Sequence, residues 1–184
     1  DVVIVETVGV GQSETEVYRL VDCFISLQIA GGGDDLQGIK KGIMEMADIV
    51  VINKDDGENR ASVAITRHMY ESALHILRRK HAAWQPRVLS CSALEQRGIE
   101  AVWLAILDFK TTLTDSGDLE KLRQRQALEW LQKQTETEAL HLLFARADFD
   151  RYFQQTLQAV KNNGLSPRTG LRQISEFLQN HYFA

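Results

Sequence analysis

The sequence predicts an α/β protein with a doubly wound, mainly parallel sheet followed by an all-helical carboxyl-terminal tail. Two observations predict the sheet. Short apolar runs alternate with helical patterns over residues 1–110, and polar residues follow several of those runs directly. The tail is predicted because the strand pattern stops before residue 118. We therefore expect two regions, 1–110 and 118–184, connected by the polar joint 111–117.

The first region carries four expected strands with helices between them. Strands buried on both faces of a parallel sheet have nearly continuous apolar sequences. The runs that fit this pattern lie near residues 1–6, 24–30, 48–53 and 86–91. Helical patterns, including one long amphipathic pattern, lie at about residues 36–46, 58–81 and 99–109.

Three helices are expected in the tail. The first runs from 118 to about 145, and the second from 149 to 160, closing at Asn162-Asn163-Gly164. The third begins after Ser166-Pro167 and ends near Phe183. The tail is rich in aromatic residues, which need a surface to pack against. That surface can belong to the chain itself or to a partner. The aromatic residues are Trp130, Phe144, Phe149, Tyr152, Phe153, Phe177, Tyr182 and Phe183.

A polar turn, Asn53-Lys54-Asp55-Asp56, follows the third apolar run. Guanine presents two adjacent donors, N1–H and its 2-amino group, and one carboxylate can accept both. We predict that Asp56 makes this charge-assisted bidentate contact. Lys54 would lay its alkyl stem along the base, and Asn53 would connect neighbouring loops. Adenine lacks both donors. The alternative is an ordinary polar turn without a ligand.

Glu6 ends the first apolar run, and Gly9 follows closely. An acid at the carboxyl end of a strand can hold the water shell of Mg²⁺, and a glycine lets a backbone N–H approach a γ-phosphate. We therefore predict Glu6 and Gly9 as catalytic residues, with Glu6 contacting the metal through water. Gln12 could orient the attacking water, but it also fits a helix start beside Ser13.

Two further loops are candidate ligand sites. Ser92 and Ala93 follow the fourth run and resemble the short Ser-Ala loop whose backbone contacts guanine O6 in GTPases. Consecutive glycines after the second run permit close backbone approach and large movement, which favours a nucleotide-sensing switch. Two lysines follow as anion contacts or as part of a solvated helix face. The predicted switch residues are Gly31, Gly32, Gly33, Asp34, Asp35, Lys40 and Lys41.

Segments 6–14, 28–42 and 53–56 together resemble the ArgK/MeaB family, and the similarity extends to the tail around 166–170. These are P-loop GTPases that act as chaperones for adenosylcobalamin-dependent methylmalonyl-CoA mutase. Some members carry an older label as a kinase linked to lysine/arginine/ornithine transport. The resemblance implies GTP, GDP and Mg²⁺ as ligands. It also implies a mutase-like cobalamin enzyme as partner, and a homodimer formed through carboxyl-terminal helices.

The chain departs from the family in one respect. The pattern G-x-x-x-x-G-K-[ST] occurs nowhere in its 184 residues. In the family, this phosphate loop precedes the strand with which the present sequence opens. We therefore expect the carboxyl-terminal portion of a longer GTPase, with a partial P-loop-GTPase-type sheet and about half of the nucleotide site.

Three other functions stay open. A kinase or ATPase coupled to basic amino-acid transport would have to accept adenine, against which the Asp56 carboxylate argues. A metal-insertion GTPase would carry Cys/His motifs. His68, Glu71 and His75 share a helix face that could hold a metal, but a charged solvent face explains them far better. The third possibility is a non-catalytic dimerisation module.

Composition limits the remaining classes. A net charge of −4 and a pI near 5.7 argue against a nucleic-acid binder. No apolar stretch approaches the roughly 20 residues that span a bilayer. Two cysteines are too few for a disulfide framework and fit buried thiols in a reducing cytoplasm, where we expect the protein.

Overall fold

The computed structural model describes residues 2–7, 13–30, 41–77 and 79–182. The chain divides into two compact units, residues 1–127 and 128–184. The first contains the sheet, and the second is helical. The domain bounds expected from the sequence, with a joint at 111–117, stay a prediction.

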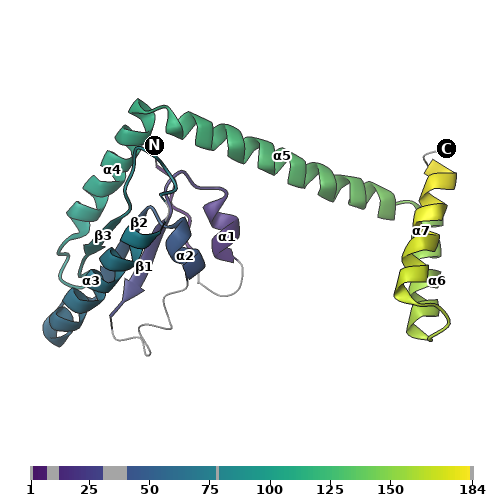
Figure 1. Cartoon of the computed structure of the whole chain (residues 1–184), viewed down its shortest axis with the longest axis horizontal. Coiled ribbons are helices and arrows are strands. Elements are labelled where there is room, and N and C mark those ends of the chain that lie inside the picture. Colours follow the sequence, from purple (N-terminus) through teal and green to yellow (C-terminus); the bar gives the residue numbers. More distant parts are fainter. Residues whose placement is uncertain (1, 8–12, 31–40, 78, 183–184) are drawn as a thin grey trace. The chain divides into compact units, whose positions relative to one another are not determined.

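Three strands form one parallel sheet in the order β1-β2-β3 (Figure 1). They are β1 (Ile25–Ile29), β2 (Ile49–Asn53) and β3 (Arg87–Ser90). Val50 on the central strand is opposite Ser26 on one side and Val88 on the other. Because all neighbours run parallel, each connection needs a crossover, which α2 and α3 provide. This arrangement confirms the predicted α/β class.

One face of the sheet packs on α1 (Ser13–Tyr18), α2 (Lys41–Met46) and α3 (Arg60–Ile76), the helices that come before β3 in the chain. Val50 and Ile52 share a hydrophobic cluster with Val63 and Tyr70 of α3. The 3₁₀ turn η1 (Gly57–Asn59) precedes α3.

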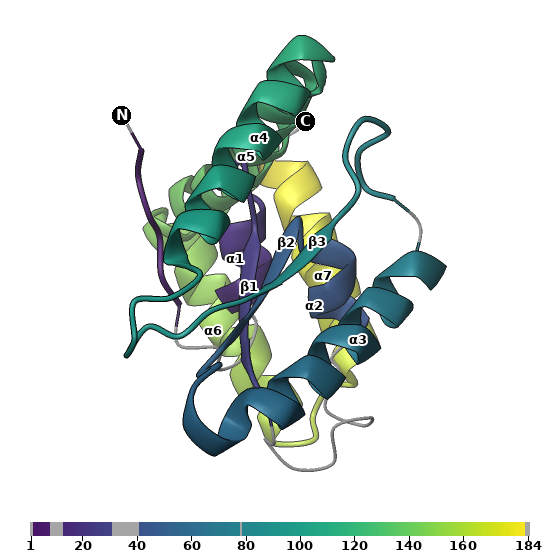
Figure 2. The same cartoon turned by 90° about the vertical axis from the view of Figure 1, so that its left-hand side faces the viewer.

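The opposite face packs on α4 (Ile99–Asp115), and Figure 2 shows α3 and α4 on the two sides of the strands. Ile49 and Val51 join Trp84 and Phe109 in this second cluster. The Trp84 and Phe109 rings meet edge to face, 5.1 Å between centroids. Residues 49–52 of β2 are thus buried on both faces, at 0–1% exposure, which makes the sheet doubly wound.

The strand expected at residues 1–6 is a wrong prediction for the part that is described. Residues 2–7 form no ladder with any described strand, and Val3 and Ile4 are each 86% exposed. An apolar run becomes a strand only when a neighbour accepts its backbone hydrogen bonds. The described residues supply none to this segment.

Two helix ends also differ from expectation. The pattern predicted to reach His81 ends at Ile76, and Leu77 is already extended. Helix α4 continues to Asp115, so Ser116 and Gly117 alone separate it from α5 (Asp118–Phe144). Gly117 has φ +73°, a backbone conformation that glycine adopts without strain.

The segment after α3 is instead held by a buried carboxylate at the amino-terminal end of β2. Asp48, 1% exposed, accepts hydrogen bonds at Oδ2 from the Phe24 N–H (2.9 Å) and from Lys80 Nζ (2.7 Å). The Trp84 indole donates to the Asp48 carbonyl at 3.0 Å. One side chain therefore connects the start of β1 with the segment that leads into β3.

The first turns of α5 belong to the sheet-containing unit. Leu122 is buried, and Arg123 forms a fork with Asp22, with Nε–Oδ1 at 2.9 Å and Nη2–Oδ2 at 2.7 Å. Hydrogen bonding to Arg123 holds the pKa of Asp22 below its ordinary value. Gln126 donates to the Val21 carbonyl at 2.8 Å. These contacts attach α5 to the segment that follows α1.

In the second unit, α6 (Ala147–Lys161) and α7 (Pro167–Tyr182) pack through aromatic rings. Phe149, 2% exposed, contacts Phe144 and Phe177, with centroids 5.2 and 6.2 Å away. Phe177 stacks on Tyr152 at 4.4 Å. Much of the aromatic tail thus packs on itself. Several apolar side chains of α5 in this unit stay 57–69% exposed: Leu128, Trp130, Leu131, Leu140 and Leu142.

Candidate functional site

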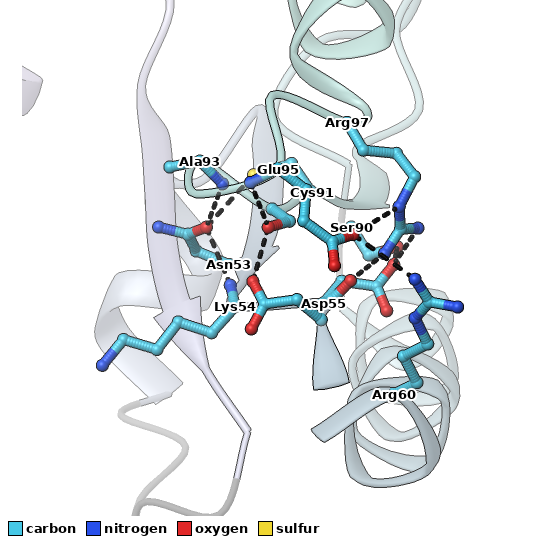
Figure 3. Close-up of polar contacts among 11 residues, drawn as sticks. Asn53, Lys54, Asp55, Arg60, Ser90, Cys91, Ala93, Glu95 and Arg97 are labelled. Carbon is cyan, nitrogen blue, oxygen red and sulfur yellow. Dashed lines mark hydrogen bonds and ion pairs between the residues drawn. The ribbon is translucent and has the colours of Figure 1, made fainter. Parts of the chain in front are cut away.

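The candidate site lies beyond the carboxyl ends of β2 and β3, where the two following loops meet (Figure 3). The Cys91 N–H donates to the Ile52 carbonyl at 3.0 Å, and the Asp55 N–H donates to the Cys91 carbonyl at 3.0 Å. The parallel register of β2 and β3 thus continues into both loops. Open α/β sheets bind ligands at this edge.

Asn53, the last residue of β2, joins the two loops through one oxygen. Its Oδ1 accepts hydrogen bonds from the Lys54 N–H (2.7 Å) and the Ala93 N–H (3.2 Å). The Cys91 thiol lies 3.6 Å from the same atom. The amide therefore fixes the position of Ala93 relative to the turn after β2.

Asp56 is oriented by a buried serine. Ser92 is fully buried, and its hydroxyl donates to Oδ2 of Asp56 while accepting the Glu95 N–H at 3.0 Å. Asp56 itself is partly exposed, and its Oδ1 accepts no hydrogen bond from the described residues. A carboxylate held in this way can still accept two adjacent donors from a ligand.

Lys54 has a left-handed backbone with φ +63°. Such a conformation costs a non-glycine residue on the order of 1–3 kcal/mol, so the surroundings must hold it. The Lys54 side chain is exposed and extends away from the other labelled residues in Figure 3. Its aliphatic stem is therefore accessible to a flat ligand.

Sequence reasoning gave no role to Asp55, Ser90 or Arg97, which the structure places together. Asp55 Oδ2 accepts the Ser90 hydroxyl at 3.0 Å and Arg97 Nη1 at 3.2 Å. Arg97 Nη2 also donates to the Asp55 carbonyl. Arg97 is 42 residues from Asp55, and no spacing rule connects the two in sequence.

Gly98 ends the loop after β3 and precedes α4. Its φ is +78°, and a Cβ there would lie 2.6 Å from the Ser90 carbonyl oxygen. Only glycine fits this close approach. The loop that carries Ser92 and Ala93 thus depends on Gly98 for its path.

Among the remaining predicted residues, the structure describes only the side chain of Glu6, which it does not bring into this site. Glu6 is exposed, and no hydrogen bond or ion pair joins it to the described residues. Lys41 begins α2, but its side chain is not among those described. The other predicted residues lie outside the described ranges: Gly9, Gly31, Gly32, Gly33, Asp34, Asp35 and Lys40.

In the described part of the chain, no group of three His, Cys, Asp or Glu residues is placed to hold a metal ion. Burial raises the pKa of the Cys23 thiol to about 12 and also raises that of Cys91. Both thiols therefore stay protonated, which opposes thiolate ligation. Within the same ranges, no helix is long and apolar enough to cross a membrane.

Comparison with known proteins identifies the family. Residues 1–148 match the family model described as methylmalonyl Co-A mutase-associated GTPase MeaB. The chain is 75% identical over 183 residues to the GTPase ArgK of Escherichia coli, covering 100% of this chain and 55% of that protein. It is 44% identical over 131 residues to the mitochondrial methylmalonic aciduria type A homolog of Mus musculus, covering 71% of this chain and 32% of that protein.

A solved structure is also similar to this chain. The chain superimposes on a crystal structure of an LAO/AO transport system kinase with a TM-score of 0.74 and 72% sequence identity, covering 94% of this chain and 55% of that one. The chain spans about half the length of the E. coli relative. The family match and these likenesses show that the chain belongs to the MeaB/ArgK family of methylmalonyl-CoA mutase-associated GTPases.

Proposed function

We propose that the protein binds and hydrolyses GTP and signals its nucleotide state to a methylmalonyl-CoA mutase-like cobalamin enzyme as a chaperone. The observation that carries this proposal is the Asp56 carboxylate, held by buried Ser92 beside Asn53 at the carboxyl ends of β2 and β3. Membership in the GTPase family supports it.

The arrangement suits guanine. Oδ1 and the second lone pair of Oδ2 of Asp56 would accept N1–H and the 2-amino group. The stem of Lys54 would cover one face of the base. The Ala93 N–H, now 3.2 Å from Asn53 Oδ1, would turn toward O6, with Ser92 holding the loop.

The phosphates need groups that this site does not contain. None of the 184 residues forms a G-x-x-x-x-G-K-[ST] loop, and we propose that sequence outside this chain supplies it. Mg²⁺ bound with GTP would neutralise charge on the phosphates, and such an ion takes few ligands from protein. We place Glu6 at its water shell and Gly9 near the γ-phosphate. Residues 6–16 and 30–42 would be the switch segments.

The helical unit would provide the subunit contact. Its aromatic rings pack within the unit, whereas the exposed leucines and Trp130 on α5 have no cover among the described residues. Large apolar side chains that stay exposed along a helix favour an interaction site. We propose a homodimer through the carboxyl-terminal helices. We also retain the prediction of a cytoplasmic location.

A transport-linked ATP-using kinase is the second candidate, because a structural relative is named as a transport system kinase. The site opposes adenine, which offers neither of the donors that Asp56 accepts. Equilibrium binding of GTP, GDP and ATP to the full-length protein, together with phosphate release, tests the proposal. We expect GTP and GDP to bind at least about 100-fold more tightly than ATP. Equal binding of ATP would contradict guanine recognition.

A further inference from the structure

We infer that Asp55 and Arg97 are positioning residues for guanine, forming a clasp that holds the Ser92–Ala93 loop against the Asn53–Asp56 turn. This inference rests on the proposed function, because it concerns how the same base site is kept in shape. Neither residue would touch the base. Each acts through its neighbours along the chain.

The clasp uses most of the polar groups of Asp55. The Asp55 N–H donates to the Cys91 carbonyl, its carboxylate accepts Ser90 and Arg97, and its carbonyl accepts Arg97. The Asp55 side chain is 16% exposed, against 45% for Arg97. Asp55 and Asp56 thus contact different residues of the same neighbouring segment: Asp55 contacts Ser90 and Arg97, whereas Asp56 contacts Ser92.

The two ends of the clasp adjoin the residues proposed to hold the base. Asp55 lies between Lys54 and Asp56 in sequence. Arg97 forms an antiparallel bridge with Ser92, in which each N–H donates to the other's carbonyl, at 2.9 and 3.0 Å. A change in the Asp55–Arg97 contact therefore shifts Asp56 and Ser92 relative to each other.

The backbone of Lys54 gives a second reason for a positioning role. Its left-handed conformation is unfavourable and persists only when contacts on both sides fix it. On the preceding side, Asn53 Oδ1 accepts the Lys54 N–H, and on the following side the clasp holds Asp55. Without Arg97, the turn can relax to an ordinary backbone conformation, which moves both the lysine stem and the carboxylate.

Glu95 extends the clasp to α3. Its Oε2 accepts Arg97 Nε at 3.4 Å and Arg60 Nη2 at 3.3 Å (Figure 3). These pairs are more exposed than the Asp55 contact, so solvent screens them strongly. We assign the positioning role to Asp55 and Arg97, and only a supporting one to Glu95.

The test measures release of a fluorescent GDP analogue from the full-length protein and its Arg97→Ala, Asp55→Ala and doubly substituted forms. We expect each single substitution to speed release about fivefold, the scale of one partly exposed charged contact. The effect of the double substitution should be smaller than the product of the two single effects, because each single substitution already removes the shared Asp55–Arg97 contact. The KM for GTP should rise while kcat changes less than twofold, since neither residue approaches the phosphates.

Matched variants separate positioning from general destabilisation. Arg87→Ala removes an arginine of similar exposure that pairs with Asp108 at the opposite end of β3, and it should leave GDP release unchanged. Arg97→Lys retains the charge without the fork and should give an intermediate rate. If Arg97→Ala fails to fold, Arg97→Lys and Asp55→Asn carry the same comparison, and each should speed GDP release by more than twofold.

The outcomes distinguish the clasp from the proposed function. If clasp variants release GDP within twofold of the wild-type rate, or if the two single effects add, the clasp is refuted. In that case, a large loss of GTP affinity in Asp56→Asn would still support the proposed guanine site. If Asp56→Asn binds GTP normally, the proposed function itself fails.

Discussion

Replacing Asp56 by Asn removes the charged acceptor that guanine requires while keeping nearly the same shape. In the structure, the Ser92 hydroxyl donates to Oδ2 of Asp56. The oxygen of an asparagine can accept that bond, so the side chain stays oriented. Its NH₂ group would then face the guanine donors, and a bidentate charge-assisted pair would become a donor–donor contact.

The size of the effect follows from those contacts. Losing a charge-assisted bidentate pair in a ligand pocket costs about 2–4 kcal/mol, or roughly 30- to 1000-fold in affinity. Xanthine carries a carbonyl where guanine has its 2-amino group, so the new NH₂ can donate to it. The Asp56→Asn full-length protein should therefore prefer XTP to GTP.

Competition binding of GTP and XTP to wild-type and Asp56→Asn protein measures this exchange. Asp108→Asn is the control, because Asp108 pairs with Arg87 on the surface away from the candidate site. We expect all three forms to melt within a few degrees of one another, since Asp56 is partly exposed in a loop. A folded Asp56→Asn protein with unchanged GTP affinity would refute the role of this carboxylate.

Four further predictions concern stability and assembly. Asp48→Ala should lower the free energy of unfolding by about 3–5 kcal/mol in chemical denaturation, because it removes the carboxylate partner of Lys80 and leaves the buried Phe24 N–H without its acceptor. Hydrogen bonding to Arg123 lowers the pKa of Asp22, so the stability from this pair is present above about pH 4 and is lost as pH falls through the lowered pKa. The stability difference between wild type and Asp22→Asn should shrink over that range. Calorimetry on the 184-residue chain alone should show no tight GTP binding, because none of its residues forms a phosphate loop. Light scattering should show that this chain self-associates and that removing residues 118–184 abolishes the association.

Each of these predictions has a contradicting outcome. Asp108 forms a surface ion pair with Arg87, and such a pair contributes under about 1 kcal/mol to stability. If Asp48→Ala lowers the free energy of unfolding no more than Asp108→Ala does, Asp48 has no structural role. A difference between wild type and Asp22→Asn that grows as pH falls would reverse the sign of the linkage. A sub-micromolar dissociation constant for GTP would contradict the third prediction. A monomer at high concentration would contradict the fourth.

The central strand and the turn after it were predictable from sequence. An apolar run that ends in Asn53-Lys54-Asp55-Asp56 favours a strand followed by a polar turn, and the last three of the four predicted runs form the three strands of the sheet. Residues 2–6 show why the same reasoning fails elsewhere. Their apolar pattern is as good as that of β2, but pairing depends on a neighbour that local sequence does not specify.

Long-range polar contacts were not predictable for a related reason. Asp48 reads as the polar start of a strand, yet it binds residues 24 and 32 positions away. Helical periodicity continues past Ile76, but Lys80 is held by Asp48 and lies beyond the helix end. The contact of Asp55 with Arg97 likewise exists only once the two loops lie side by side. Neither the net charge nor the composition of a sequence predicts which residues form such contacts.

The raised pKa of both thiols has a practical consequence for spectroscopy. Cys23 and Cys91 are the only cysteines in these 184 residues, and burial keeps both protonated. Alkylating probes react with accessible thiolates, so the folded chain should present almost no background to a maleimide dye. A single cysteine introduced at an exposed position, such as Gln134 on α5, would then carry one fluorophore without first replacing the native residues. Paired with a second such site in residues 1–127, it would allow the distance between the two units to be followed as nucleotide is exchanged.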